Sequence, residues 1–230
     1  MSVSKWVLGA GGGIAALAAV GAIAQAPVKK NWIAVIAPTD GGHRIGNPAA
    51  KVKLTEYISY TCPHCAAFAR DGEGALHLAY IETGKINLEV RHLIRDPIDL
   101  TAALLVNCGP PGKFLQNHQA FMLGQSQWIA PMVTASATQQ ARWRLPGATG
   151  RRAIANDFKF YDLMERRGYT HTQTDKCLAD EPAARKMAAT AAADWKLPGV
   201  EGTPAFAIDG LILSGTASWK ALAPQLDARL

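Results

Sequence analysis

The sequence Cys62-Pro63-His64-Cys65 stands between an apolar run, residues 52–60, and the segment 66–70. The apolar run is rich in β-branched and aromatic residues, so it predicts a strand. The segment that follows predicts the opening of a helix, and Pro63 suits a first helical turn, where a missing N–H costs nothing. A Cys-x-x-Cys pair at a strand-to-helix junction indicates redox chemistry, because the first thiol then lies at a helix N-terminus.

The position of Cys62 favours a thiolate. Unpaired backbone N–H groups and the positive end of the helix dipole stabilise a negative charge there. A pKa three units below the free thiol's value of about 8.5 corresponds to roughly 4 kcal/mol, whereas a helix end supplies about 0.3–2 kcal/mol. The remainder is expected from direct hydrogen bonds and a neighbouring positive group, for which His64 is the candidate.

Two other interpretations of the cysteine pair are a zinc half-site and two buried structural cysteines. A structural zinc site normally needs a second pair of Cys or His residues at close spacing. Cys108 and Cys177 stand far apart, and no such second pair is found in the sequence. The spacing therefore favours redox chemistry, with no metal site expected.

Cys-Pro-His-Cys on this strand–helix frame resembles the DsbA-like thiol:disulfide oxidoreductases, which have the thioredoxin fold. Two further features carry the resemblance. Gly202-Thr203-Pro204-Ala205-Phe206 precedes another predicted strand, and the family places a cis-proline opposite its cysteines, where Thr203-Pro204 would stand. Glu56, six residues before Cys62, matches a buried acid of the family.

The resemblance implies an α/β chain of thioredoxin fold, with a mixed central sheet and an inserted helical subdomain. Residues 27–97 would form the first part with the cysteine motif, residues 98–198 the helical insertion, and residues 199–230 the second part. The length of 230 residues suits one domain with an insertion or two small domains.

Residues 1–26 are expected to be a signal peptide or an N-terminal anchor. Between Trp6 and Val28 no charged residue occurs, and Ala22-Ile23-Ala24 offers a small-x-small cleavage site with Gln25 starting the mature protein. The apolar run exceeds the usual signal core and approaches a spanning length. In either case the folded part would lie outside the cytoplasm.

The formal charge of +6 is scattered along the chain without a long basic run. Arg151-Arg152 and Arg166-Arg167 are therefore assigned to solvated helix faces, and no nucleic-acid partner is expected. Residues 41–48 are interpreted as turn material, with His43 on the surface.

Pattern analysis predicts the remaining elements. Strands are expected over 32–36, 86–93, 203–208 and 211–214, with a hairpin turn at Asp209-Gly210. Helices are expected over 98–107, 128–143, 151–167, 181–196 and 218–228. The helix that opens at Cys62 should kink or break at Gly72 and Gly74.

Glu56 shares one side of its strand with the apolar residues Leu54 and Ile58. It is either an acid paired with a lysine or placed at the sheet margin, or a proton acceptor for the resolving Cys65, since burial raises the pKa of a carboxyl. The family resemblance favours the second interpretation.

Cys108 and Cys177 remain once the motif claims its own two cysteines. A disulfide between them is plausible in an exported chain, and the alternative is two buried free thiols. In the chain-entropy model, closing a loop of this length adds roughly 4 kcal/mol of stability.

The predicted function is a periplasmic thiol:disulfide oxidoreductase that donates the Cys62–Cys65 disulfide to reduced, unfolded exported proteins. Thr203 and Pro204 would align an extended substrate segment. The disulfide itself is the redox centre, without another cofactor. The resemblance further implies a quinone-linked membrane reoxidant of the DsbB type, and the short lead-in favours a monomer.

Two rival functions remain open. A disulfide isomerase or reductase shares this core but usually carries a separate dimerisation domain. A non-catalytic thioredoxin-like module that binds a metal or a partner is the second rival, and the metal content of the purified protein distinguishes it.

Overall fold

In the computed structural model, which describes residues 1–5 and 30–230, six strands form one mixed sheet in the order β1-β2-β4-β3-β5-β6. β3 and β4 are parallel, and the other neighbours pair antiparallel. The strands are β1 (Ile36–Pro38), β2 (Gly42–Gly46), β3 (Val52–Ile58), β4 (Ile86–His92), β5 (Ala205–Ile208) and β6 (Leu211–Ile212).

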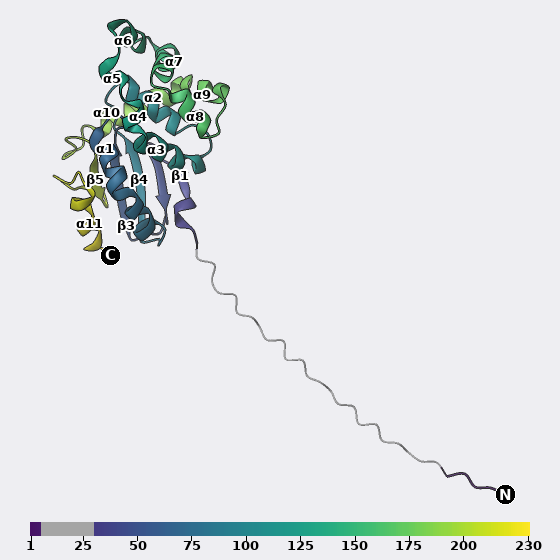
Figure 1. Cartoon of the computed structure of the whole chain (residues 1–230). Helices are drawn as coiled ribbons and strands as arrows, with labels where there is room; N and C mark the ends of the chain where they lie inside the picture. The colour runs from purple at the N-terminus through teal and green to yellow at the C-terminus, as the bar shows by residue number, and fades with distance from the viewer. Residues whose placement is uncertain (6–29) are drawn as a thin grey trace. The chain divides into compact units, whose positions relative to one another are not determined.

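Most of the helices lie in sequence between β4 and β5, and Figure 1 shows several of them gathered at one end of the sheet. The α-helices are α1 (Pro63–Phe68), α2 (Pro97–Val106), α3 (Phe114–Leu123), α4 (Gln125–Trp128), α5 (Pro131–Thr134), α6 (Ala137–Trp143), α7 (Gly147–Asp157), α8 (Phe160–Arg166), α9 (His171–Leu178), α10 (Glu181–Asp194) and α11 (Trp219–Asp227). Short helices of other types are η1 (Trp32–Ala34), η2 (Ala69–Glu73), η3 (Leu76–Ile81) and η4 (Pro111–Lys113). The predicted fold class, a mixed sheet with a helical insertion, is confirmed.

β3 lies inside the sheet and leads directly to the cysteine motif. It pairs on one side with β4, where Glu56 faces Val90, and on the other with β5, where Glu56 faces Phe206. Both neighbours are apolar and almost fully buried. A strand that is covered on both edges and both faces has a nearly continuous apolar sequence. This is why the strand could be predicted from the sequence.

Of the kink or break predicted at Gly72 and Gly74, the break is wrong, although the helix departs from regular α geometry on both sides of Gly74. The helix continues from α1 through the wide π turns of η2 and η3, and Gly74 keeps a helical φ of −58°. Gly72 has a packing role instead, because a Cβ there would lie 2.7 Å from the Cβ of Trp219 on α11. The glycine allows this close approach of two helices.

The region before β3 also differs from its prediction. The expected strand over 32–36 is η1 followed by β1, and the expected turn over 41–48 contains β2. Gly42 pairs closely with β4, since a Cβ at this position would meet the Val90 carbonyl oxygen. His43 is only 6% exposed and stacks on Phe114 at 4.1 Å, so its assignment to the surface is wrong.

Two long helices predicted in the insertion are divided. The range 128–143 comprises the end of α4, then α5 and α6, and α6 begins at the capping box of Ser136 and Gln139. The range 151–167 separates into α7 and α8 at Lys159, which has a left-handed φ of 59°. Arg151 is buried rather than solvated: its guanidinium binds the Leu178 carbonyl at 2.6 Å and the Glu181 carboxylate.

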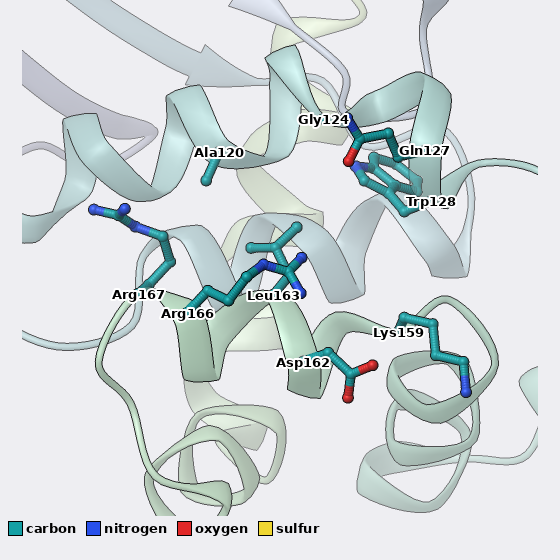
Figure 2. A pocket seen from close by; sticks show the side chains of 9 residues that line it. All are labelled: Ala120, Gly124, Gln127, Trp128, Lys159, Asp162, Leu163, Arg166 and Arg167. Carbon is teal, nitrogen blue, oxygen red and sulfur yellow. The ribbon is translucent and has the colours of Figure 1, made fainter.

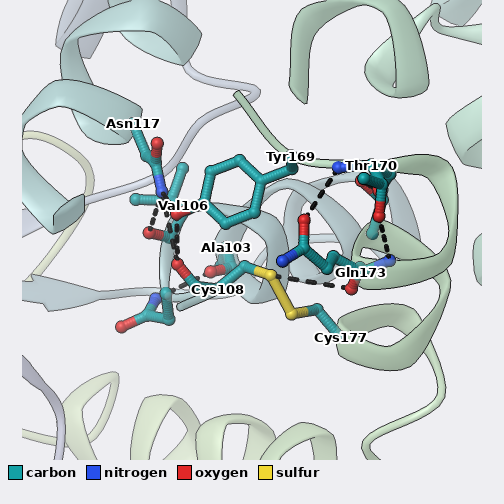
Figure 3. Close-up of a disulfide and its surroundings, with 10 residues drawn as sticks. Ala103, Val106, Cys108, Asn117, Tyr169, Thr170, Gln173 and Cys177 are labelled. Carbon is teal, nitrogen blue, oxygen red and sulfur yellow. Dashed lines mark hydrogen bonds between the residues drawn. A yellow bond between two sulfur atoms is a disulfide. The ribbon is translucent and has the colours of Figure 1, made fainter. Parts of the chain in front are cut away.

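The disulfide between Cys108 and Cys177 joins the end of α2 to α9, with the two Cα atoms 5.7 Å apart (Figure 3). The Tyr169 hydroxyl donates a hydrogen bond to the Cys108 carbonyl at 2.6 Å. The Asn117 side chain in turn donates to the Tyr169 hydroxyl at 2.9 Å. The bridge therefore ties together helices that are distant in sequence.

Residues 31–230 form one compact unit. Residues 1–5 have no regular structure, and the leader predicted over 1–26 falls largely on residues 6–29, which lie outside the described part. Within residues 1–5 and 30–230, no helix combines the length and apolarity needed to cross a bilayer.

Candidate active site

The turn after β3 places Cys62 at the N-cap of α1 and Pro63 at its first position. The Cys62 N–H donates to the Ser59 carbonyl at 3.2 Å, and the Ala66 N–H donates to the Cys62 carbonyl at 3.3 Å. Cys65 follows one turn later on the buried face of the helix. Both cysteines carry free thiols, so the structure describes the dithiol form of the pair.

The two thiols have opposite acidities. Hydrogen bonding from the Cys65 thiol lowers the pKa of Cys62 to about 5, helped by the Thr203 side chain and two backbone N–H groups and opposed by burial. Burial raises the pKa of Cys65 well above its usual value, and its hydrogen bond to Cys62 adds to this effect. The first sulfur is therefore the thiolate and the second keeps its proton.

His64 contributes to this arrangement through its backbone. Its N–H is one of the donors that lower the pKa of Cys62. The imidazole lies exposed at the surface. The hydrogen bonds that lower the pKa of Cys62 come chiefly from Cys65, and the contribution expected from the His64 side chain stays a prediction.

The loop before β5 lies against Cys62. The peptide bond between Thr203 and Pro204 is cis. The Cys62 Sγ lies 3.1 Å from the Thr203 carbonyl oxygen, across 141 residues of sequence. The structure therefore brings together the two motifs that carried the family resemblance.

Glu56 is 2% exposed and lies on β3, the strand that leads to the cysteine pair. Burial raises its pKa well above the usual value, and the charge of Glu73 raises it further. The charge of Glu56 in turn adds to the causes that raise the pKa of Cys65.

Two polar residues that sequence reasoning missed hold the active-site turn. Asp99 is fully buried and accepts hydrogen bonds from Ser59 Oγ at 2.6 Å and from the Tyr60 N–H at 2.8 Å. Gln125 Nε2 donates to the Tyr60 carbonyl at 2.7 Å and to the Cys62 carbonyl at 2.9 Å. Helices α2 and α4 of the insertion thus fix the backbone that carries the first cysteine.

A cleft of about 390 Å³ opens at the cysteine motif. Its lining combines the motif with residues of three other segments: Cys62, Pro63, His64, Arg95, Trp195, Glu201, Gly202 and Thr203. A second hollow of about 220 Å³ shares Glu201, Gly202 and Thr203 with the first and continues toward residues 213–217. Arg95 and Trp195 were not predicted, because only the fold brings them to the motif.

A larger cavity of about 550 Å³ lies away from the cysteine pair, between α3, α4 and α8. Figure 2 shows Trp128 and Leu163 in its wall, with Arg166, Arg167, Lys159 and Asp162 around it. No cysteine lines this cavity, so it takes no part in the redox site. Within residues 1–5 and 30–230, no three His, Cys, Asp or Glu side chains are grouped as metal ligands.

Comparison with known proteins places this geometry in a family. The family model described as Thioredoxin matches residues 38–228. The crystal structure of protein-disulfide isomerase from Novosphingobium aromaticivorans has a TM-score of 0.78 and 47% identity, covering 81% of this chain and 95% of that chain. Wolbachia pipientis alpha-DsbA1 shares the fold with a TM-score of 0.60 at 22% identity, covering 80% of this chain and 88% of that one.

Proteins named protein-disulfide oxidoreductase in Rickettsia are more distant in sequence. The Rickettsia bellii protein is 26% identical over 192 residues, which cover 82% of this chain and 65% of that protein. The Rickettsia typhi protein is 28% identical over 170 residues, covering 73% of this chain and 54% of that protein. This chain therefore spans about half to two thirds of their lengths. It belongs to the thioredoxin family, and its architecture is DsbA-like.

Proposed function

We propose that the chain is a thiol:disulfide oxidoreductase that donates its Cys62–Cys65 disulfide to reduced, unfolded proteins in the periplasm. The observation that carries this proposal is the opposite acidity of the two thiols. A sulfur with a pKa of about 5 is a good leaving group and a stable thiolate. The dithiol form is thereby favoured, and the disulfide becomes oxidising.

The reaction proceeds through a mixed disulfide. A substrate thiolate attacks the Cys62 sulfur, the bond to Cys65 breaks, and its electron pair leaves on Cys65. The second substrate thiolate then attacks the substrate sulfur that is bound to Cys62. Cys62 departs as its stabilised thiolate, and the substrate leaves with a new disulfide.

The cleft positions the substrate for the first attack. An extended segment can bind the backbone of Thr203, which lines the cleft, as an added strand, since backbone hydrogen bonds require no particular side chains. Trp195 and Arg95 flank the same opening. This mode of binding suits the many unrelated sequences of unfolded proteins.

Glu56 is proposed as the proton partner of Cys65. A buried carboxyl with a raised pKa can give a proton to the departing Cys65 sulfur and can take it back when Cys65 attacks a stalled mixed disulfide. A quinone-linked membrane partner of the DsbB type is proposed to restore the Cys62–Cys65 disulfide. The working form is proposed to be a monomer.

A disulfide isomerase is the second candidate, because the Novosphingobium aromaticivorans structure at 47% identity carries that name. An isomerase works from its dithiol form and attacks incorrect disulfides. An oxidase instead transfers its own disulfide. One substrate protein, supplied either reduced or with scrambled disulfides, distinguishes the two activities.

The deciding experiment compares both activities on that substrate, beside a measurement of size in solution. We expect rapid oxidation of the reduced substrate, slow unscrambling and a monomer. A dimer that unscrambles efficiently and oxidises slowly would replace the oxidase with the isomerase. A redox titration of the Cys62–Cys65 pair supplies the corresponding potential.

A further inference from the structure

The cavity of about 550 Å³ between α3, α4 and α8 lies apart from the cysteine pair, and the proposed oxidase reaction does not use it. Sites that hold small molecules commonly have volumes of about 300–1,000 Å³, and this cavity is within that range. Figure 2 shows α8, with Arg166 and Arg167, on one side of the cavity and α3, with Ala120, on the other. Its lining combines apolar and cationic side chains, which restricts the chemistry of a ligand.

The apolar part of the lining comes from all three helices. Ala120 lies on α3, Trp128 on α4 and Leu163 on α8. Trp128 and Leu163 are only 5% and 6% exposed, so the core fixes their positions. The Trp128 indole packs on Phe160 with the ring centroids 5.1 Å apart, and its N–H donates to the Phe121 carbonyl at 2.9 Å. Because that N–H already has its acceptor, this wall offers a ligand apolar contact.

The charged part of the lining is mainly cationic. Lys159, Arg166 and Arg167 carry positive charges, and among the lining residues only Asp162 carries a negative one. Asp162 and Arg166 are four positions apart on α8, which places them on one face of the helix. In the described part of the chain, however, neither Arg166 nor Lys159 forms an ion pair with Asp162 or with any other acid. The cavity therefore has an excess of positive charge that the protein does not neutralise.

Arg167 adds a hydrogen-bond donor that lacks an acceptor. Its Nη2 donates to Gln116 Oε1 at 2.8 Å, which anchors the guanidinium group. Its Nε is buried and has no hydrogen-bond partner among the described residues. A buried N–H without an acceptor is costly, and an anionic oxygen in the cavity that Arg167 lines would supply one. Arginine is well suited to this task, because its planar fork of N–H groups matches the oxygens of carboxylates and phosphates.

We propose that this cavity is a binding site for a small amphipathic anion, a molecule with a carboxylate, sulfonate or phosphate group and an apolar body. The anionic group binds Arg166 and Arg167, and the apolar body lies against Leu163 and Trp128. An inorganic ion would leave the apolar wall uncovered, and a neutral apolar molecule would leave the arginines without a counter-charge. The proposal goes beyond the oxidase function and does not rest on it.

The test is isothermal titration calorimetry of the purified protein with naphthalenesulfonate as the probe at neutral pH. Inorganic phosphate, which has no apolar body, and naphthol, which is uncharged at this pH, are the comparison ligands. We expect saturable binding of the sulfonate that is tighter than that of either comparison ligand by about 10-fold. Its affinity should be lower at about 0.5 M salt than at about 0.05 M salt, because salt screens the arginines. A sulfonate that binds no more tightly than phosphate would overturn the proposal.

Variants of the lining residues locate the binding. Arg166 and Asp162 are exposed, so their replacement leaves the core intact. Arg166→Gln should weaken sulfonate binding about 5-fold, the size expected of one solvent-exposed ion pair, and Arg167→Gln should weaken it at least as much. Asp162→Asn should strengthen it about 2-fold, because a repulsive charge is removed. Arg185→Gln is the matched control, since Arg185 is exposed on α10 and does not line the cavity. Equal affinities in wild type, Arg166→Gln and Arg167→Gln would refute the site.

Two further measurements identify the source of the ligand and keep the oxidase function separate. Vesicles of phosphatidylglycerol that displace the sulfonate from the wild type would assign the anionic group to a lipid, and vesicles that do not would assign it to a free small molecule. Arg166→Gln should oxidise a peptide dithiol at the wild-type rate, because Arg166 does not line the cleft at Cys62. A protein that binds the sulfonate as expected but oxidises no dithiol would lose the oxidase function and keep this site.

Discussion

The two cysteine pairs of this chain use the same bond for opposite purposes. Cys62 and Cys65 are one helical turn apart and stand as free thiols with opposite acidities. Cys108 and Cys177 are 69 residues apart and form a disulfide between helices. A long closed loop makes a disulfide stabilising, whereas a stabilised thiolate makes a disulfide easy to lose. The surroundings of the sulfur atoms therefore decide whether a bridge is structural or reactive.

The largest expected effect is on the rate of dithiol oxidation, which should depend on Cys62 and Cys65 but not on Cys108 and Cys177. Cys62→Ser should reduce oxidation of a peptide dithiol to the uncatalysed rate, because the attacked sulfur is gone. Cys65→Ser should instead accumulate a mixed disulfide with substrate, visible by mass spectrometry. Cys108→Ala with Cys177→Ala serves as the control and should retain most of the oxidation rate. Equal losses in all three proteins would remove the distinction.

The second effect concerns stability against pH. Folding lowers the pKa of Cys62 to about 5, and each unit by which the folded value lies below the unfolded one favours the folded dithiol form by at most about 1.4 kcal/mol, less where solvent screens the thiolate. Because the folded value is the lower one, this stability is fully present above the unfolded pKa and is lost as the pH falls to about 5. The disulfide form lacks the thiolate and should not show this dependence.

Urea unfolding of both redox forms at several pH values checks this prediction. The free energy of unfolding of the dithiol form, relative to Cys62→Ser, should decline steadily from pH 9 to pH 5. A difference that does not vary with pH would contradict the low pKa.

The third effect is on the structural bridge. Replacing Cys108 and Cys177 by alanine should lower the free energy of unfolding by about 4 kcal/mol in the chain-entropy model. The measurement is urea unfolding of the variant under non-reducing conditions. Peptide mapping of the wild type should show the two cysteines linked, and two free thiols in exported protein would contradict the bridge.

The smallest effect tests the contact between the helical insertion and the active-site turn. Gln125→Ala removes two hydrogen bonds to the active-site turn, which should cost about 1–3 kcal/mol of stability. The reactivity of Cys62 toward iodoacetamide should change with it. Gln127→Ala is the matched control, since Gln127 lies exposed on the same helix. If Gln125→Ala and Gln127→Ala have the same stability and the same Cys62 reactivity, the hydrogen bonds of Gln125 have no specific role at the active-site turn.

The strand β3, the helix start at Cys62 and the Thr203–Pro204 loop could be predicted because local sequence carries their signals. Gln125 and Glu73 could not, since a polar residue on a helix faces the core or the solvent according to packing that no short window records. His43 was misplaced for a related reason. Gly41 and Gly42 suggest a turn, whereas Gly42 actually allows β2 to pair closely with β4.

The division of the predicted helix at Lys159 also could not be predicted from the local sequence. Neither glycine nor proline marks this position, yet Lys159 adopts a left-handed backbone between α7 and α8. The role of Glu56 was suggested by the family resemblance, and its burial agrees with the period of the strand. The charge that acts on it comes from Glu73 on η2, 17 positions further along the chain.

The Cys62 side chain offers almost no surface to solvent: the residue is 3% exposed, at the base of its cleft. A thiolate must approach the Cys62–Cys65 disulfide nearly in line with the bond that breaks. A cysteine on a loose chain can adjust to a sulfur that is recessed in this way more readily than a cysteine held on a rigid, convex domain surface. Under the proposed function, the recessed sulfur would make the reaction rate a measure of how mobile the substrate protein is, and a substrate would stop reacting once it has folded.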